Sequence, residues 1–316
     1  MRTDASVFPP ELLGRIELVR VPARFPYALS QRFANWDFEN RAARFCRDGW
    51  KTVSASRVPV PVDMAISGGT HFAHLVKKGK AHPSFTDRLV MNHERLFYSQ
   101  ARVCVAHSLM TREEILALGV AEPEKVVCLF PPVDTTRFNL SARAYRERIR
   151  SSWGVSEKDF VLLFPSNNHE LKGADLILSA LDALDDSGAV LAVASRRPIE
   201  HPRVVNVGFH ADVEKCYAAA DATILASKYE AFGLVAVESI LCGTPALLSE
   251  TCGATDALSA PACIKFPRTQ EGVMAAVSLA RERQRAGTLA LADPERFVRY
   301  PFSLEKHVDA LLALLA

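Results

Sequence analysis

Two glutamates in the second half of the chain, Glu230 and Glu238, stand eight positions apart with Gly233 between them. The glycine lies in a turn before a predicted helix, and Glu238 lies about one turn inside that helix. Free N–H groups at a helix N-terminus attract an anion, and glycine lets a phosphate approach the backbone closely. A carboxylate one turn further can accept hydrogen bonds from two vicinal ribose hydroxyls. This spacing predicts a nucleotide site, with Glu238 toward the ribose and Glu230 toward a sugar.

The same pair has a plainer interpretation, with Glu230 as a solvated loop charge and Glu238 as a complement to the helix dipole. The surrounding residues favour the nucleotide site. The string Y-E-A-F-G-L at 229–234, followed by Glu238 and by C-G-T-P at 242–245, closely resembles the E-x7-E signature and the following turn of the family 4 retaining glycosyltransferases. The resemblance implies two Rossmann-like domains of the GT-B fold and a nucleoside-diphosphate sugar as donor substrate.

A lysine motif earlier in the chain fits the same family. Residues 168–173, N-H-E-L-K-G, follow a predicted strand at 160–165 and resemble the family's K-G turn, whose lysine contacts the donor diphosphate. Lys172 is the matching residue, and its compact ammonium suits a phosphate. An exposed lysine in a turn is the plainer interpretation. The resemblance also implies donor contacts by Ser166, Gly173, Phe232, Gly233 and Leu234.

A histidine is the candidate on the acceptor side. Residues 68–74, G-G-T-H-F-A-H, follow a predicted strand at 62–67 and resemble the region where the family often has a histidine that contacts the donor sugar near its reacting carbon. His71 therefore joins Glu230 and Lys172 as a predicted catalytic residue. In the alternative, His71 and His74 only share one face of a helix start, and a zinc site would need further ligands.

Further matches and two departures define how far the resemblance extends. A-H-S at 106–108 and P-P-V-D-T-T-R-F at 131–138 resemble the family's helix start and interdomain linker, and F-S-L-E at 302–305 resembles the segment that crosses back to the first domain. Family members usually begin with a strand and a glycine-rich loop, so we expect the first β-α-β unit to be missing. The arginine that often precedes the K-G lysine is replaced by S-N-N at 166–168.

The elements that must position these residues alternate between strand and helix. Apolar runs predict strands at 16–21, 62–67, 102–106, 126–130, 160–165, 189–194, 204–207, 223–226, 246–249 and 263–266. Helical patterns at 83–98, 109–118, 174–184 and 212–220 lie between them. Such alternation indicates α/β domains with parallel sheets and helices on both faces. We expect an abridged N-terminal acceptor-side domain at 1–139, a nucleotide-sugar-binding domain at 140–300 and a crossing helix at 301–316.

Composition narrows the class of protein further. The 316 residues are 49% apolar, which suits two domains with separate cores. The sequence has no apolar run long enough to span a bilayer and no secretory signal, so we expect a cytoplasmic protein. Seven widely spaced cysteines without a C-x-x-C pair argue against a disulfide framework and a zinc site.

Charge is distributed unevenly along the chain. Residues 1–140 hold 19 lysines and arginines against 14 aspartates and glutamates, whereas residues 141–316 hold 19 against 22. A basic first half favours an acidic acceptor or peripheral contact with the anionic inner face of a membrane, although an ordinary solvated surface explains the same balance. We expect no nucleic-acid partner.

The resemblance implies retaining, metal-independent transfer of a hexosyl-type sugar to a hydroxyl of a glycan or lipid-linked acceptor, as in cell-surface polysaccharide or lipopolysaccharide synthesis. No cofactor is expected besides the donor substrate. Two alternatives stay open because fold does not fix function: a sugar-nucleotide epimerase and a non-catalytic partner subunit. The sequence does not determine the base, the transferred sugar or the acceptor.

Overall fold

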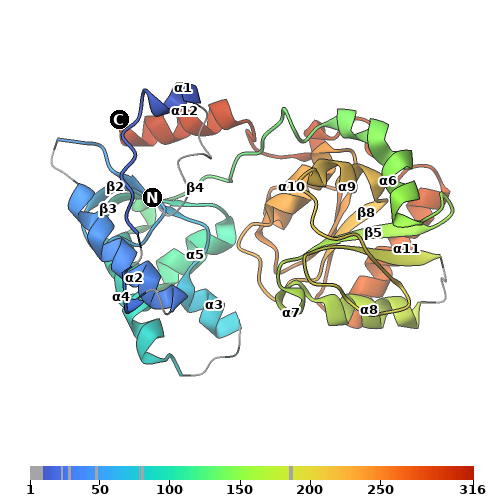
Figure 1. Ribbon diagram of the computed structural model, residues 1–316, viewed down its shortest axis with the longest axis horizontal. Coiled ribbons are helices and arrows are strands. Elements are labelled where there is room, and N and C mark those ends of the chain that lie inside the picture. The colour runs from blue at the N-terminus through green and yellow to red at the C-terminus, as the bar shows by residue number, and fades with distance from the viewer. Residues whose placement is uncertain are drawn as a thin grey trace. The chain divides into compact units, whose positions relative to one another are not determined.

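The chain forms two compact units, each built on its own parallel sheet (Figure 1). The computed structural model describes residues 10–22, 24–27, 30–46, 49–77, 79, 82–184 and 188–316. Unit 1 comprises Met1–Ala106, Thr111–Cys128 and Leu314–Ala316, and unit 2 comprises His107–Met110 and Leu129–Ala313. The main division thus lies before the P-P-V-D segment, whereas the sequence predicted a boundary at 139/140.

Unit 1 has a four-stranded sheet in the order β1-β2-β3-β4, and each neighbouring pair is parallel. The strands are β1 (Val53–Ser54), β2 (Val62–Ser67), β3 (Ala101–Ala106) and β4 (Val126–Cys128). The helices of this part of the chain are α1 (Pro10–Leu13), α2 (Gln31–Ala42), α3 (His71–Lys77), α4 (Phe85–Gln100) and α5 (Leu109–Ala117). The predicted strands at 62–67, 102–106 and 126–130 are confirmed within two residues at each end.

The predicted strand at 16–21 is wrong. Residues 17–22 have no regular structure, and Ile16 and Val19 are exposed. Apolar residues produce a strand only where a neighbouring strand supplies hydrogen bonds and a core covers one face. Within the described residues, the outer strands of this sheet are β1 and β4, and β1 pairs with β2.

Unit 2 has a six-stranded parallel sheet in the order β10-β9-β8-β5-β6-β7. Its strands are β5 (Phe160–Pro165), β6 (Ala189–Ala194), β7 (Val204–Asn206), β8 (Ala222–Leu225), β9 (Ala246–Ser249) and β10 (Cys263–Phe266). Its helices are α6 (Arg146–Trp153), α7 (His169–Lys172), α8 (Ala174–Ala183), α9 (Val213–Ala219), α10 (Leu234–Leu241), α11 (Gln270–Arg285) and α12 (Leu304–Leu315). All six predicted strands of this half are confirmed, four of them with the same bounds.

Helices cover both faces of the second sheet (Figure 1). Along β5, Val161 and Leu163 belong to one core with residues of α9 and α10. Phe160, Leu162 and Phe164 belong to the opposite core with residues of α8 and α11. Because both faces are buried, the strand is apolar at every position, and this explains why the apolar runs predicted it well.

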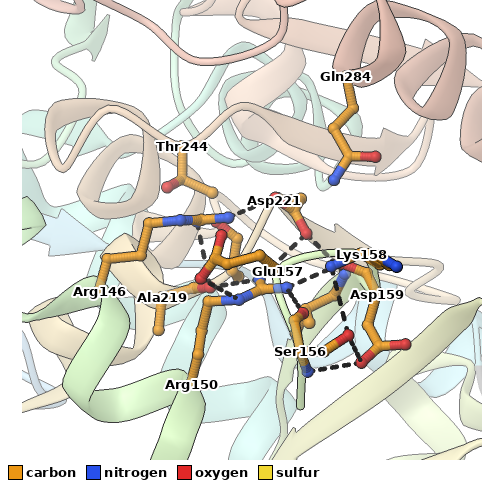
Figure 2. Close-up of polar contacts among 12 residues, drawn as sticks. Arg146, Arg150, Ser156, Glu157, Lys158, Asp159, Ala219, Asp221, Thr244 and Gln284 are labelled. Carbon is orange, nitrogen blue, oxygen red and sulfur yellow. Dashed lines mark hydrogen bonds and ion pairs between the residues drawn. The ribbon is translucent and has the colours of Figure 1, made fainter.

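A buried arginine fixes the amino-terminal edge of this sheet (Figure 2). The guanidinium of Arg150, 1% exposed, donates to the Asp159 carbonyl at 2.8 Å and lies 3.3 Å from Asp221 Oδ2. Asp221 also accepts from the Val161 amide at 2.8 Å and from Arg146 at 2.7 Å. A buried charge needs such pairing to offset its desolvation. The network lies before β5 and β8, at the sheet edge opposite the loops that follow these strands.

The proline segment lies next to the residues that precede the terminal helix, within unit 2. The Val133 amide donates to the Phe302 carbonyl at 2.9 Å, and the Tyr300 hydroxyl donates to the Pro131 carbonyl at 2.9 Å. Helix α12 then begins in unit 2, and its last residues belong to unit 1, where Arg102 donates to the Leu314 carbonyl at 2.9 Å.

All seven cysteines are free thiols, as predicted, and four of them are buried. Among the described residues, no helix combines the length and the apolar character needed to cross a membrane.

Candidate functional site

The strand order of unit 2 reverses between β5 and β8, which are neighbours in the sheet. Ligands of open α/β sheets bind beyond the carboxyl ends of the strands at such a switch point. The loops that follow these two strands contain Lys172 and Glu230. A backbone hydrogen bond of 2.8 Å from the Lys228 amide to the Leu171 carbonyl joins the loops. The motif residues far apart in the sequence therefore share one rim of the sheet.

Lys172 is the last residue of the short helix α7, not a residue of an open turn. The side chain of Asn168 caps this helix by accepting from the Leu171 amide at 3.2 Å. Gly173, with φ +79°, ends α7 and begins α8. A Cβ at this position would overlap the carbonyl of Ala226, so both the backbone angle and the close approach to the β8 loop require glycine.

Lys172 and Glu230 form a hydrogen-bonded ion pair, in which Nζ donates to Oε2. Their side chains are 22% and 21% exposed, so each retains access to solvent. Glu230 is therefore not an isolated solvated charge, and Lys172 is not an unpaired lysine of a turn. The pair places a cation and an anion together at the carboxyl edge of the sheet.

The backbone of the Glu230 loop is held by the segment that follows β9. The Glu230 amide donates to the Thr251 carbonyl at 3.1 Å, and the Gly253 amide donates to the Glu230 carbonyl at 3.0 Å. Gly233 has φ +95°, and a Cβ there would lie 2.7 Å from Cys252 Sγ. These contacts fix the backbone of Glu230. A residue that contacts a reacting ligand needs such a fixed position.

Glu238 is the fifth residue of α10 and points its carboxylate toward a buried tyrosine. The Tyr217 hydroxyl donates to Glu238 Oε2 at 2.8 Å. Burial raises the pKa of the Glu238 carboxyl above its ordinary value, while the Tyr217 hydrogen bond and the charge of Arg137 act in the opposite direction. Glu238 is thus held in a partly desolvated position and is not a fully exposed complement to the helix dipole.

The C-G-T-P turn after α10 connects this carboxylate to the rest of the unit. Gly243 has φ +84°, which favours glycine at the end of the helix. The Thr244 hydroxyl donates to the Tyr217 carbonyl at 2.8 Å, and the Pro245 carbonyl accepts from the Thr223 amide at 2.9 Å. The turn therefore fixes both α9, which carries Tyr217, and the start of β8.

Three other predicted donor residues lie in unit 2 with different exposure. The Phe232 side chain is 5% exposed and packs against Phe130 and Tyr300. Leu234 is the first residue of α10. Ser166 is buried, and its hydroxyl lies 2.9 Å from His169 Nδ1.

His71, the predicted acceptor-side residue, belongs to unit 1 and begins α3. Its Nε2 lies 3.1 Å from Oδ1 of the buried Asp87, and its amide donates to Glu94 Oε1 at 2.7 Å. Burial lowers the pKa of His71, and the hydrogen bond to Asp87 opposes this. His74 lies in the same helix, as the alternative interpretation required.

Comparison with known proteins places the chain in a family. The sequence profile described as "Glycosyl transferases group 1" matches residues 145–271. A protein of Burkholderia thailandensis named "Probable transglycosylase" is 39% identical over 292 residues, which cover 86% of this chain and 79% of the relative. The chain belongs to the group 1 glycosyl transferases.

More distant relatives of this glycosyl transferase match mainly one part of it. A D-inositol 3-phosphate glycosyltransferase of Jonesia denitrificans is 25% identical over 67% of the chain, and the chain covers 54% of that relative. A second such enzyme, from Catenulispora acidiphila, is 29% identical over 49% of the chain, which covers 43% of the relative. The chain thus spans about half the length of these two relatives.

Solved structures support the predicted GT-B fold. WaaG, described as a glycosyltransferase involved in lipopolysaccharide biosynthesis, superposes with a TM-score of 0.66 at 20% identity over 85% of this chain and 79% of its own. Anabaena Alr3699/HepE, crystallised with UDP and glucose, gives 0.64 at 17% identity over 80% of this chain and 77% of its own. The prediction of two Rossmann-like parallel-sheet domains is confirmed.

Sequence reasoning missed two contributors to the site of this glycosyl transferase. Tyr217 lies in a predicted helix at 212–220, and nothing in its sequence neighbours indicates a polar contact with Glu238. The E-T-C-G segment at 250–253 follows β9 and holds Glu230. The rule that loops after parallel strands form the site could have indicated this second segment.

Proposed function

We propose that this glycosyl transferase moves a sugar from a nucleoside-diphosphate sugar to a hydroxyl of a glycan or lipid-linked acceptor, with retention of the anomeric configuration. The observation that carries the proposal is the ion pair of Lys172 and Glu230 at the switch point between β5 and β8, beside the helix that contains Glu238. The K-G motif supplies Lys172 and the E-x7-E string supplies Glu230 and Glu238, in the order that the resemblance to the retaining family implies.

The donor's parts match the chemistry of these side chains. The ammonium of Lys172 has three donors, so it can hold a diphosphate oxygen while it stays near Glu230. The first N–H groups of α10 offer further contacts to the anion. Glu238 accepts from the ribose hydroxyls, and Glu230 accepts from hydroxyls of the transferred sugar. Phe232 contributes through its backbone, because its ring is packed in the core.

The reaction breaks the bond between the anomeric carbon and the diphosphate oxygen and forms a bond from that carbon to the acceptor oxygen. Negative charge grows on the leaving diphosphate, and the acceptor hydroxyl attacks the same face and passes its proton to the departing diphosphate oxygen. Preorganised cationic and N–H groups at the diphosphate lower the barrier. We assign this stabilisation to Lys172 and α10, with no metal requirement, and assign His71 of unit 1 to the donor sugar.

The acceptor class is proposed from relatives and charge. WaaG is described as acting in lipopolysaccharide biosynthesis, and the Burkholderia relative is named as a transglycosylase. The excess of basic residues in the first 140 residues suits an anionic cell-surface glycan precursor or the inner face of a membrane. Sedimentation with vesicles containing anionic lipid should therefore decrease as salt is raised, and binding that salt does not affect would contradict this localisation.

A ligand panel followed by a product assay tests the proposal. UDP, GDP, ADP and their hexose conjugates are added to the full chain, and Tm is measured. A nucleotide that binds the folded protein stabilises it by a free energy of RT ln(1 + [L]/Kd) and should therefore raise Tm. The conjugate that binds is then incubated with candidate acceptors, with and without EDTA, and the anomeric configuration of the product is read by proton NMR. Inverted product, or an activity abolished by EDTA, would contradict the mechanism. Epimerised donor without acceptor, or binding without any release of nucleoside diphosphate, would overturn the transferase assignment.

A further inference from the structure

Tyr217 is a buried residue whose hydroxyl donates a hydrogen bond to Glu238. The residue is fully buried in α9, and its ring lies 6.2 Å from the ring of Phe138. Its carbonyl is fixed by the Thr244 hydroxyl of the C-G-T-P turn at 2.8 Å. The hydroxyl of this buried side chain donates to Glu238 Oε2 at 2.8 Å.

The direction of this hydrogen bond follows from burial. Desolvation raises the pKa of Tyr217 well above its ordinary value, so the hydroxyl keeps its proton and donates it. The acceptor is Oε2 of Glu238. A hydrogen bond to an ionised partner is roughly twice as strong as one between neutral groups, and this strength fixes the carboxylate plane.

The second carboxylate oxygen is left for a ligand. Within the part of the chain that the structure describes, Oε1 of Glu238 accepts no hydrogen bond, and Oε2 keeps one lone pair beyond the bond from Tyr217. A carboxylate fixed at one oxygen presents its three remaining lone pairs, two on Oε1 and one on Oε2, in one orientation. Two vicinal hydroxyls are the donor set that matches these sites.

We infer that Tyr217 is a positioning residue, which acts through Glu238 to make the enzyme select a ribonucleotide donor over a 2′-deoxyribonucleotide. The inference rests on the proposed function, because Glu238 must meet the donor ribose. Without the Tyr217 hydroxyl, the Glu238 side chain can rotate. The carboxylate then no longer holds the orientation that favours a ribose with two vicinal hydroxyls over a 2′-deoxyribose with one. The loss should then fall on the 2′-hydroxyl contact and spare the diphosphate contact.

Calorimetric titration of matched nucleotides tests the inference. UDP, GDP and ADP identify the base that the parent binds, and the corresponding 2′-deoxynucleoside diphosphate is then compared. We expect the parent to prefer the ribonucleotide by about tenfold or more, the equivalent of ~1.4 kcal/mol. Tyr217→Phe keeps the ring and should reduce this preference to about threefold or less, with the deoxynucleotide affinity nearly unchanged. With the matching nucleotide sugar, KM should rise more than kcat falls.

Two further variants separate positioning from a general loss of packing. Tyr98→Phe removes another buried hydroxyl, which contacts Ser67 at 2.8 Å in unit 1, and should keep the parental preference. If Tyr217 acts through Glu238, the double variant Tyr217→Phe/Glu238→Gln should bind the ribonucleotide no more weakly than Glu238→Gln alone. This comparison stays informative even if Tyr217→Phe lowers Tm.

The outcomes distinguish the inference from the proposed function. A parent that binds no nucleoside diphosphate would overturn both. If the parent selects the ribonucleotide and Tyr217→Phe keeps the same preference, the role of Tyr217 is overturned. Additive losses in the double variant would overturn it as well. In both cases the proposed function stays intact.

Discussion

Lys172 and Glu230, 58 residues apart in the sequence, form an ion pair that joins the loop after β5 to the loop after β8. If Lys172 holds the donor diphosphate as proposed, the diphosphate must share or displace this pairing, because both anions then contact the same ammonium. Removal of Lys172 leaves an unpaired anion at the site, whereas removal of Glu230 leaves an unpaired cation, so the two changes should affect the binding of an anionic ligand in opposite directions. The two partners can therefore be assigned separately by mutation.

Replacing Lys172 with Met should weaken nucleoside-diphosphate binding strongly. The change keeps most of the aliphatic stem but deletes a charge-assisted hydrogen bond of about 1.5 to 3 kcal/mol, and it leaves Glu230 as an unpaired anion beside the phosphates. Titration calorimetry measures the change. Lys172→Arg should rescue only part, because a planar guanidinium does not reproduce a compact ammonium.

Lys228→Met is the matched control, since Lys228 lies in the same loop pair but bonds to Glu170 at 2.8 Å. It should keep the parental affinity. If Lys172→Met binds within twofold of the parent, Lys172 is outside the site. Arg196 and Arg197, which follow β6 on the same rim, then become the cations to test.

Glu230→Ala should separate turnover from binding. Removal of the carboxylate frees Lys172, so the affinity for a nucleoside diphosphate without its sugar should stay the same or increase. The kcat with the nucleotide sugar should fall on the order of 10²-fold, as expected when one preorganised transition-state contact is lost. Glu238→Ala should instead weaken nucleotide binding. Wild-type kinetics in both variants would remove the two glutamates from the site.

Glu238→Gln should make the protein more stable above the ordinary carboxyl pKa. Burial raises the folded-state pKa of Glu238, so its contribution to stability is fully present below the unfolded pKa and is lost as pH rises through the folded pKa. The glutamine has no such charge to bury, although Tyr217 and Arg137 still face it. We expect a higher Tm for this variant than for the parent at pH 8, and the gain should disappear on acidification.

The same protonation should affect ligand binding in the opposite sense. Nucleotide affinity of the parent should fall as pH decreases through the raised pKa of Glu238, because the neutral carboxyl loses acceptor capacity. Scanning calorimetry and titration over a pH series check both effects. A variant that gains stability equally at every pH would show that the cause is not the charge.

Arg150→Met should destabilise unit 2 by about 3 kcal/mol or more, because it removes one of the cations paired with the buried Asp221 and the side-chain donor to the carbonyls of Ala219 and Asp159 (Figure 2). Arg148→Met, on the exposed side of the same helix, should be nearly neutral. Denaturant unfolding measures both. Since this network lies at the sheet edge opposite Lys172, the folded Arg150 variant should retain the parental nucleotide affinity, and a loss there would contradict a purely structural role.

The sequence by itself determined much of the second unit. Strands such as β5 and β9 are buried on both faces, so their residues are apolar throughout and their bounds are visible without a structure. In contrast, the apolar residues at 16–21 predicted a strand wrongly, because composition does not show whether a neighbouring strand is available to pair.

Only the tertiary structure decided which of these residues meet. Strand order places β8 beside β5, and this order brings Glu230 to Lys172 across 58 positions of sequence. The Tyr217 hydroxyl reaches Glu238 because α9 and α10 pack on the same face of the sheet, and no periodicity of either helix specifies that contact. Motif spacing is set by local backbone geometry, which a sequence displays directly. Side-chain partnership is set by packing between distant elements, and it becomes visible only when the sheet is assembled.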